Sequence, residues 1–131
     1  MLLTPVYASL FALVFVYLSS RTVQLRDRYK VTLGDGDQPV LMRAIRAHAN
    51  FVEYVPLALL LLYFVETQTE HRAWVNVMGP GLLIARISHA YGISQVGERL
   101  RFRVTGMVLT GVVLLVCAIA LIAGHMPDMS V

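Results

Sequence analysis

Charged and polar side chains recur at helical spacing in one short segment, residues 43–56, and this segment holds most of the chemistry in the sequence. Four of them stand at offsets 0, 3, 7 and 10, so they share one face of an α-helix: Arg43, Arg46, Asn50 and Glu53. The stripe extends about 15 Å along the helix axis. An ionised group in lipid costs about 2.5 to 3.5 kcal/mol even on lenient insertion scales. The stripe is therefore predicted to face other helices or a water-filled cavity.

A second polar segment, residues 86–91, offers partners for this stripe. Arg86 and His89 are three residues apart and share a face if the segment is helical. In antiparallel helices the two polar zones lie at similar depth, which would allow Glu53 to pair with Arg86. A single ion pair would do no more than fix helix register, whereas several arginines with an amide, a carboxylate and a His at one depth favour a ligand pocket. Guanidinium groups bind carboxylates, and a carboxylate side chain binds an ammonium group. A site with several arginines and one carboxylate therefore predicts a small zwitterionic, peptide-like ligand with excess negative charge.

Four apolar runs must position these residues. The chain is 57% hydrophobic and only 15% charged, against roughly 25% charged in ordinary soluble domains, and its mean hydropathy is +0.67. Each run is long enough to cross a hydrocarbon core of about 30 Å, and the inner two each contain one charge, Glu53 or Arg86. The runs cover residues 1–20, 47–65, 73–91 and 104–124. The sequence thus predicts an all-α fold, an integral membrane four-helix bundle, as a single domain over residues 1–131.

The basic residues predict the orientation of this bundle. Residues 21–46 contain six of them and residues 92–103 contain three, whereas the connection between the second and third runs has only Arg72. The positive-inside rule places both basic connections in the cytoplasm and both termini on the non-cytoplasmic side. The same distribution argues against nucleic acid as a partner. No four-ligand His/Cys spacing is present, so we expect no metal site.

The motif Arg46-Ala-His-Ala-Asn50, followed by Glu53-Tyr54-Val-Pro, resembles the second-span signature of the membrane-associated proteins in eicosanoid and glutathione metabolism (MAPEG). A second motif at residues 86–89 supports the resemblance, and the Gly-Asp-Gly-Asp loop at residues 34–37 and the segment 89–92 are similar to the small bacterial branch of the family. The resemblance implies a multi-pass protein of the bacterial inner membrane. It also implies a homotrimer that binds glutathione between neighbouring subunits on the cytoplasmic side and takes a lipophilic small molecule from the lipid bilayer.

The resemblance implies roles for individual residues as well. The glutathione-binding set comprises Arg46, Asn50, Glu53, Tyr54, Arg86, His89, Tyr91 and, from the first helix, Arg26. The catalytic arginine that stabilises the glutathione thiolate is expected at the start of the fourth helix, where Arg101 and Arg103 both qualify. Ile93 stands seven residues after Arg86, where eicosanoid enzymes of the family often place a Tyr, so glutathione binding is better supported than eicosanoid synthesis.

The function predicted on this basis is glutathione binding with a transferase- or peroxidase-type reaction, in which a glutathione thiolate attacks an apolar electrophile from the bilayer. Two other classes stay open. One is a non-enzymatic membrane binding or structural subunit. The other is a small multidrug-type transporter, although such proteins place their essential carboxylate in the first span, and residues 1–20 carry no charge.

Overall fold

The computed structural model describes residues 2–68, 72–97 and 99–125. Within these ranges it contains four α-helices and one short 3-10 helix before α3, which confirms the predicted all-α fold. The helices are α1 (Thr4–Tyr29), α2 (Pro39–Gln68), α3 (Val75–Ser94) and α4 (Leu100–His125). Met1 and residues 126–131, the two ends of the predicted single domain, lie outside the described residues.

The helices are longer than the apolar runs that predicted them. α1 continues from the end of its apolar run to Tyr29, and α2 begins eight residues before its run, at Pro39. Proline suits this first position because it has a preset φ and its missing N–H is not needed there. The connection between α1 and α2 turns at positive φ, with Lys30 at +55°, Gly34 at +74° and Gly36 at +56°. The Gly-Asp-Gly-Asp segment at residues 34–37 therefore lies in the turn between the helices, and the basic residues beside it lie on helical extensions.

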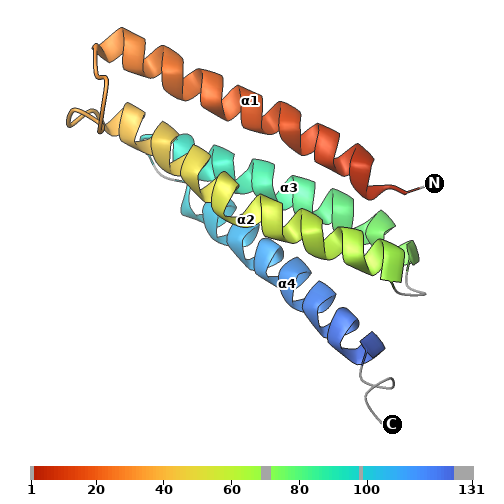
Figure 1. Cartoon of the computed structure of the whole chain (residues 1–131). Helices are drawn as coiled ribbons and strands as arrows, with labels where there is room; N and C mark the ends of the chain where they lie inside the picture. Colours follow the sequence, from red (N-terminus) through yellow and green to blue (C-terminus); the bar gives the residue numbers. More distant parts are fainter. Residues whose placement is uncertain (1, 69–71, 98, 126–131) are drawn as a thin grey trace.

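The helices run alternately up and down, as Figure 1 shows. The α1–α2 and α3–α4 connections lie at one end of the bundle, which we call the basic end. The start of α1 and the C-terminal end of α2 lie at the opposite end, which we call the terminal end. α2 and α3 form the centre: α1 packs on both, α4 packs on both, and α1 and α4 do not touch within the described residues.

Three of these helices, α1, α2 and α4, are long and apolar enough to cross a membrane. α3 is not in this group, although its 20 residues would extend about 30 Å. Its polar residues lower its mean hydropathy. These residues can avoid contact with lipid because α3 packs against the other three helices. Side chains such as Leu13, Val108 and Ile122 are exposed on the outside of the bundle. A lipid environment accounts for such exposure.

Candidate functional site

Arg86 is the centre of the site near the basic end. Its side chain is 1% exposed, and its Nη2 donates a hydrogen bond of 2.6 Å to Oδ1 of Asn50 on α2. Its Nη1 lies 3.5 Å from the hydroxyl of Thr110 on α4, and its guanidinium carbon lies 5.5 Å from the centre of the Tyr54 ring. The antiparallel packing of α2 and α3 thus brings together three members of the predicted glutathione-binding set: Asn50, Tyr54 and Arg86.

The expected ion pair between Glu53 and Arg86 is not formed. Among the side chains that the structure describes, no carboxylate lies within 4.0 Å of the Arg86 guanidinium. Three helical residues correspond to 300°, so Glu53 is turned about 60° from Asn50, and its side chain is exposed. Asn50, and not Glu53 as predicted, is therefore the α2 partner of Arg86. The buried guanidinium is held by a neutral amide, and its Nε has no hydrogen-bond partner.

His89 connects the site to the start of α4. Its Nδ1 lies 3.1 Å from the backbone carbonyl oxygen of Arg103, which is consistent with Nδ1 as the protonated nitrogen. Its Nε2 is buried without a hydrogen-bond partner. The helices approach closely here because residue 106 is glycine: a Cβ at Gly106 would lie 2.5 Å from the carbonyl oxygen of Ala85. The close α3–α4 contact thus fixes where α4 begins relative to Arg86.

The other predicted site residues on α2 and α4 have their side chains on the outside of the subunit. Arg46, Glu53 and Arg101 are exposed, and Arg103 is partly buried. The structure of one chain therefore divides the predicted constellation into two parts. The buried part comprises Arg86 and His89 together with Asn50 and Tyr54, which are only half-buried and lie beside the Arg86 guanidinium. The exposed part comprises Arg46, Glu53 and Arg101.

The two remaining predicted residues lie elsewhere. Nη1 of Arg26 approaches the backbone carbonyls of the loop after α1, with distances of 3.3 Å to Thr32 and 2.9 Å to Gly34. Tyr91 lies on the α1 side of α3, where its ring packs edge-to-face on Phe102 at 5.5 Å between centroids. Neither residue contacts Arg86, so within one subunit both lie apart from the buried part of the site.

Sequence reasoning missed the contribution of α4 to the site. Thr110 lies in an uncharged run, where its hydroxyl donates 2.7 Å to the Gly106 carbonyl and accepts from Arg86. Met107 Sδ lies 3.9 Å from Arg86 Nη1. The signal in the sequence was the spacing of Gly106 and Thr110: a small and a hydroxyl residue one turn apart in a span permit close helix contact and a polar contact across it.

Comparison with known proteins agrees with this architecture. The model described as "MAPEG family" matches residues 4–123. "Inner membrane protein YecN" of Escherichia coli (strain K12) is 37% identical over 119 residues, which cover 91% of this chain and 89% of that protein. YecN of Escherichia coli O6:H1 (strain CFT073) gives the same values. With the apolar helices, these similarities confirm the predicted location, the bacterial inner membrane, with several membrane spans.

Proposed function

The chain belongs to the MAPEG family, and from this membership together with the site geometry we propose that it binds glutathione and activates the glutathione thiol toward an apolar electrophile. The observation that carries the proposal is the buried Arg86 guanidinium, which is hydrogen-bonded to Asn50 and has no carboxylate within ion-pair distance. A buried cation without a counter-ion is costly and is stabilised when an anion binds beside it. Glutathione supplies two carboxylates.

The exposed part of the site supports a homotrimer. Arg46 and Glu53 stand on the outside of a single subunit, on a helix apolar enough to span the membrane. Ionisable side chains in such a helix need a protein or water environment, and a neighbouring copy of the chain would supply it. In the proposed assembly glutathione lies between two subunits and contacts Arg46 and Glu53 from one side. Mass measurement in nanodiscs should give three copies, and a stable monomer or dimer would contradict the assembly.

The proposed chemistry requires no side-chain nucleophile from the protein. The thiolate of glutathione is the reactive species, and an arginine within about 4 to 6 Å lowers the pKa of a thiol by favouring its charged form. Arg101 and Arg103 stand in the first turn of α4 at the basic end. One of them would stabilise the thiolate, which then attacks the electrophilic atom of an apolar substrate. That attack forms a carbon–sulfur bond, and the displaced group leaves with the electron pair.

Calorimetric titration of glutathione into the purified protein tests binding. Glu53→Gln and Arg46→Ala should each weaken binding about 10- to 100-fold, because each removes the charge that faces an oppositely charged group of the ligand. Arg28→Ala is the matched control for charge, since Arg28 is exposed on α1 and contacts the Tyr29 ring. Unchanged affinity in a folded Glu53→Gln protein would refute the proposed contact between Glu53 and glutathione.

A difference spectrum near 240 nm tests thiol activation, because the thiolate absorbs there. The signal should appear when glutathione is added to the wild-type protein at pH 7. It should be lost in Arg101→Leu or Arg103→Leu while much of the binding remains. If wild-type protein binds glutathione only as the thiol between pH 6 and pH 8, the activation mechanism is wrong. A non-enzymatic binding protein would then account for the site.

The predicted orientation has its own test. Single cysteines at Gly36 and Ser130 should be labelled from opposite sides of the membrane, with the basic end in the cytoplasm. Gly36 lies in the α1–α2 connection, and Ser130 lies outside the described residues. Labelling of both positions from one side would contradict the orientation and would place the glutathione site on the wrong side of the membrane.

A further inference from the structure

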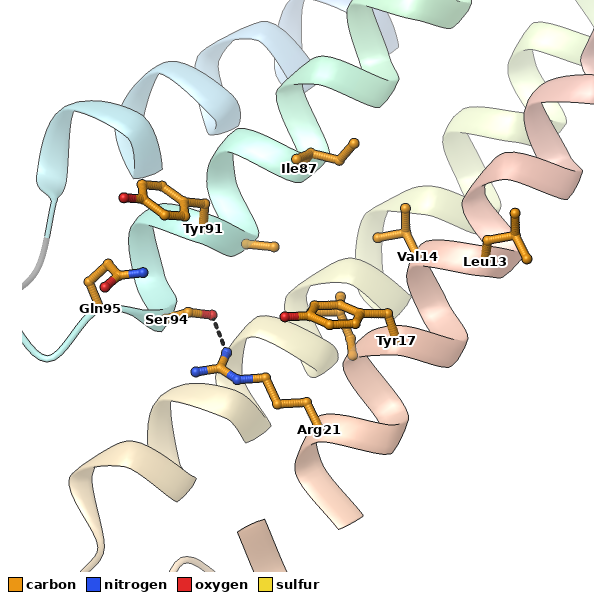
Figure 2. A pocket seen from close by; sticks show the side chains of 10 residues that line it. Leu13, Val14, Tyr17, Arg21, Ile87, Tyr91, Ser94 and Gln95 are labelled. Atoms are coloured by element: carbon orange, nitrogen blue, oxygen red, sulfur yellow. Dashed lines mark hydrogen bonds between the residues drawn. The ribbon is translucent and has the colours of Figure 1, made fainter. Parts of the chain in front are cut away.

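A cavity lies between α1 and α3 near the basic end, and the proposed glutathione site does not use it. Its volume is about 620 Å³, within the usual range of roughly 300 to 1,000 Å³ for small-molecule sites. Figure 2 shows Tyr17 and Arg21 reaching into it from α1, opposite Tyr91 and Ser94 on α3. Leu13, Val14 and Ile87 extend the lining away from these polar side chains. The cavity therefore has one polar end and one apolar end.

The polar end carries a positive charge with no counter-ion. Nη1 of Arg21 donates a hydrogen bond of 2.6 Å to the hydroxyl of Ser94, which is neutral. Among the residues that the structure describes, no carboxylate lies within 4.0 Å of this guanidinium. The remaining N–H groups of Arg21 are suited to an anionic oxygen, and the Tyr17 and Tyr91 side chains line the same cavity.

The place of Arg21 in the sequence puts this charge at a membrane surface. It is the first charged residue after 20 uncharged ones, so it marks the boundary of the first span. Leu13 lies eight residues earlier, about 12 Å deeper along α1. Basic pockets between membrane helices at the cytoplasmic surface are suited to anionic lipid head groups. An acyl chain attached to such a head group would follow the apolar side chains toward the bilayer centre.

We propose that the α1–α3 cavity binds one anionic phospholipid of the membrane, with its phosphate on Arg21 and one acyl chain along Leu13, Val14 and Ile87. The bilayer is the source of this ligand because the cavity opens between two helices whose outer faces are exposed and apolar. The site is separate from the glutathione site, since Arg86 and His89 turn toward α2 and α4. The bound lipid would fill this cavity and stabilise the packing of α1 against α3.

Native mass spectrometry tests the head-group contact. Protein in a neutral detergent is titrated with dioleoyl phosphatidylglycerol, and separately with dioleoyl phosphatidylcholine, which has the same chains. Wild-type protein should retain phosphatidylglycerol in preference to phosphatidylcholine. Arg21→Ala should weaken retention of phosphatidylglycerol about tenfold, because a charge-assisted contact is lost. Arg28→Ala, which removes the same charge from the same helix outside the cavity, should change retention less than twofold.

A second pair of variants tests the contact between the cavity and the acyl chain of the lipid without altering the charge of the protein. Ile87 lines the cavity and is 48% exposed, whereas Ile84 lies one turn earlier on α3, is 63% exposed and does not line it. Ile87→Trp should reduce retention of phosphatidylglycerol to the level of Arg21→Ala, and Ile84→Trp should leave it unchanged. Circular dichroism confirms that both variants fold.

Four results would overturn the proposal. Equal retention of the two lipids, or equal effects of Arg21→Ala and Arg28→Ala, would show that Arg21 does not select an anionic head group. Tighter binding of free oleate than of phosphatidylglycerol would identify a fatty acid as the ligand. A change of oligomeric mass in Arg21→Ala, with lipid retention unaltered, would show that a second copy covers the cavity. Glutathione affinity, measured in the same variants, reports separately on the proposed function.

Discussion

The two ends of the bundle differ in how they hold their buried charged group. At the terminal end, the carboxylate of Glu66 is 1% exposed and accepts hydrogen bonds from the backbone N–H groups of Leu3 and Thr4, the second at 2.8 Å. These are the orphan donors at the start of α1, where the helix dipole also favours a negative charge. Toward the basic end, the guanidinium of Arg86 is equally buried, but its Nε and the Nε2 of His89 have no partner.

This difference separates a structural site from a candidate ligand site. A buried carboxylate whose oxygens receive backbone donors is complete and stabilises the attachment of α1 to α2. A buried cation that is held by an amide and a hydroxyl, with unpartnered nitrogens beside it, is incomplete without a further group. The terminal end should therefore respond to substitution through stability, and the basic end through binding.

The largest expected effect is on ligand affinity at the basic end. Arg86→Leu should weaken glutathione binding about 100-fold, because it removes the buried cation and releases Asn50 and Tyr54. The free energy of unfolding should change by less than about 1 kcal/mol, since loss of the Asn50 hydrogen bond is offset by removal of a buried charge without a counter-ion. Calorimetry and thermal unfolding measure the two quantities. A large loss of stability with unchanged affinity would make Arg86 a structural residue.

The next effect concerns the α3–α4 contact beneath the site. Gly106→Ala should lower the free energy of unfolding by about 1 to 3 kcal/mol, because its Cβ would meet the Ala85 backbone and His89. Gly111→Ala is the matched control in the same helix, where a Cβ meets nothing within 4 Å. That control should stabilise the protein by up to about 1 kcal/mol, since alanine favours helix. Equal effects of the two substitutions would argue against close packing at Gly106.

At the terminal end, Glu66→Gln should lower the free energy of unfolding by roughly 0.5 to 2 kcal/mol. The amide keeps one acceptor for the start of α1 but loses the negative charge that the helix dipole favours. Thermal unfolding in detergent measures this loss, and glutathione affinity should stay within twofold of wild type. Weakened glutathione binding in a fully folded Glu66→Gln protein would show that the two ends are coupled.

The smallest effect is expected for Arg26. Its guanidinium approaches the carbonyls of the loop after α1 in an exposed arrangement, where water replaces a lost donor and each hydrogen bond contributes only about 0.5 kcal/mol. Arg26→Ala should therefore lower stability by about 1 kcal/mol or less. It should weaken glutathione binding much less than Arg46→Ala, which the same titration tests. A loss of affinity equal to that of Arg46→Ala would give Arg26 the ligand role that the family resemblance implies.

The sequence by itself determined the architecture of this protein. Four apolar runs of 19 to 21 residues leave few alternatives to membrane-spanning helices, because the backbone must satisfy its own hydrogen bonds in lipid. The second-span motif was enough to indicate the family. Helical spacing and antiparallel packing also predicted that Asn50 and Arg86 would lie at similar depth, and the family resemblance added Tyr54 to the same site.

Only the tertiary structure decided which of these polar residues are partners. Helical periodicity gives a direction around each axis, but the choice between Asn50 and Glu53 as the partner of Arg86 depends on a rotation of about 60°, which packing fixes. The contribution of Thr110 and the role of Glu66 at the start of α1 depend on contacts between residues 24 and 62 positions apart. Side chains that are distant in sequence become neighbours only through the way the helices pack, and spacing within one helix carries no information about that.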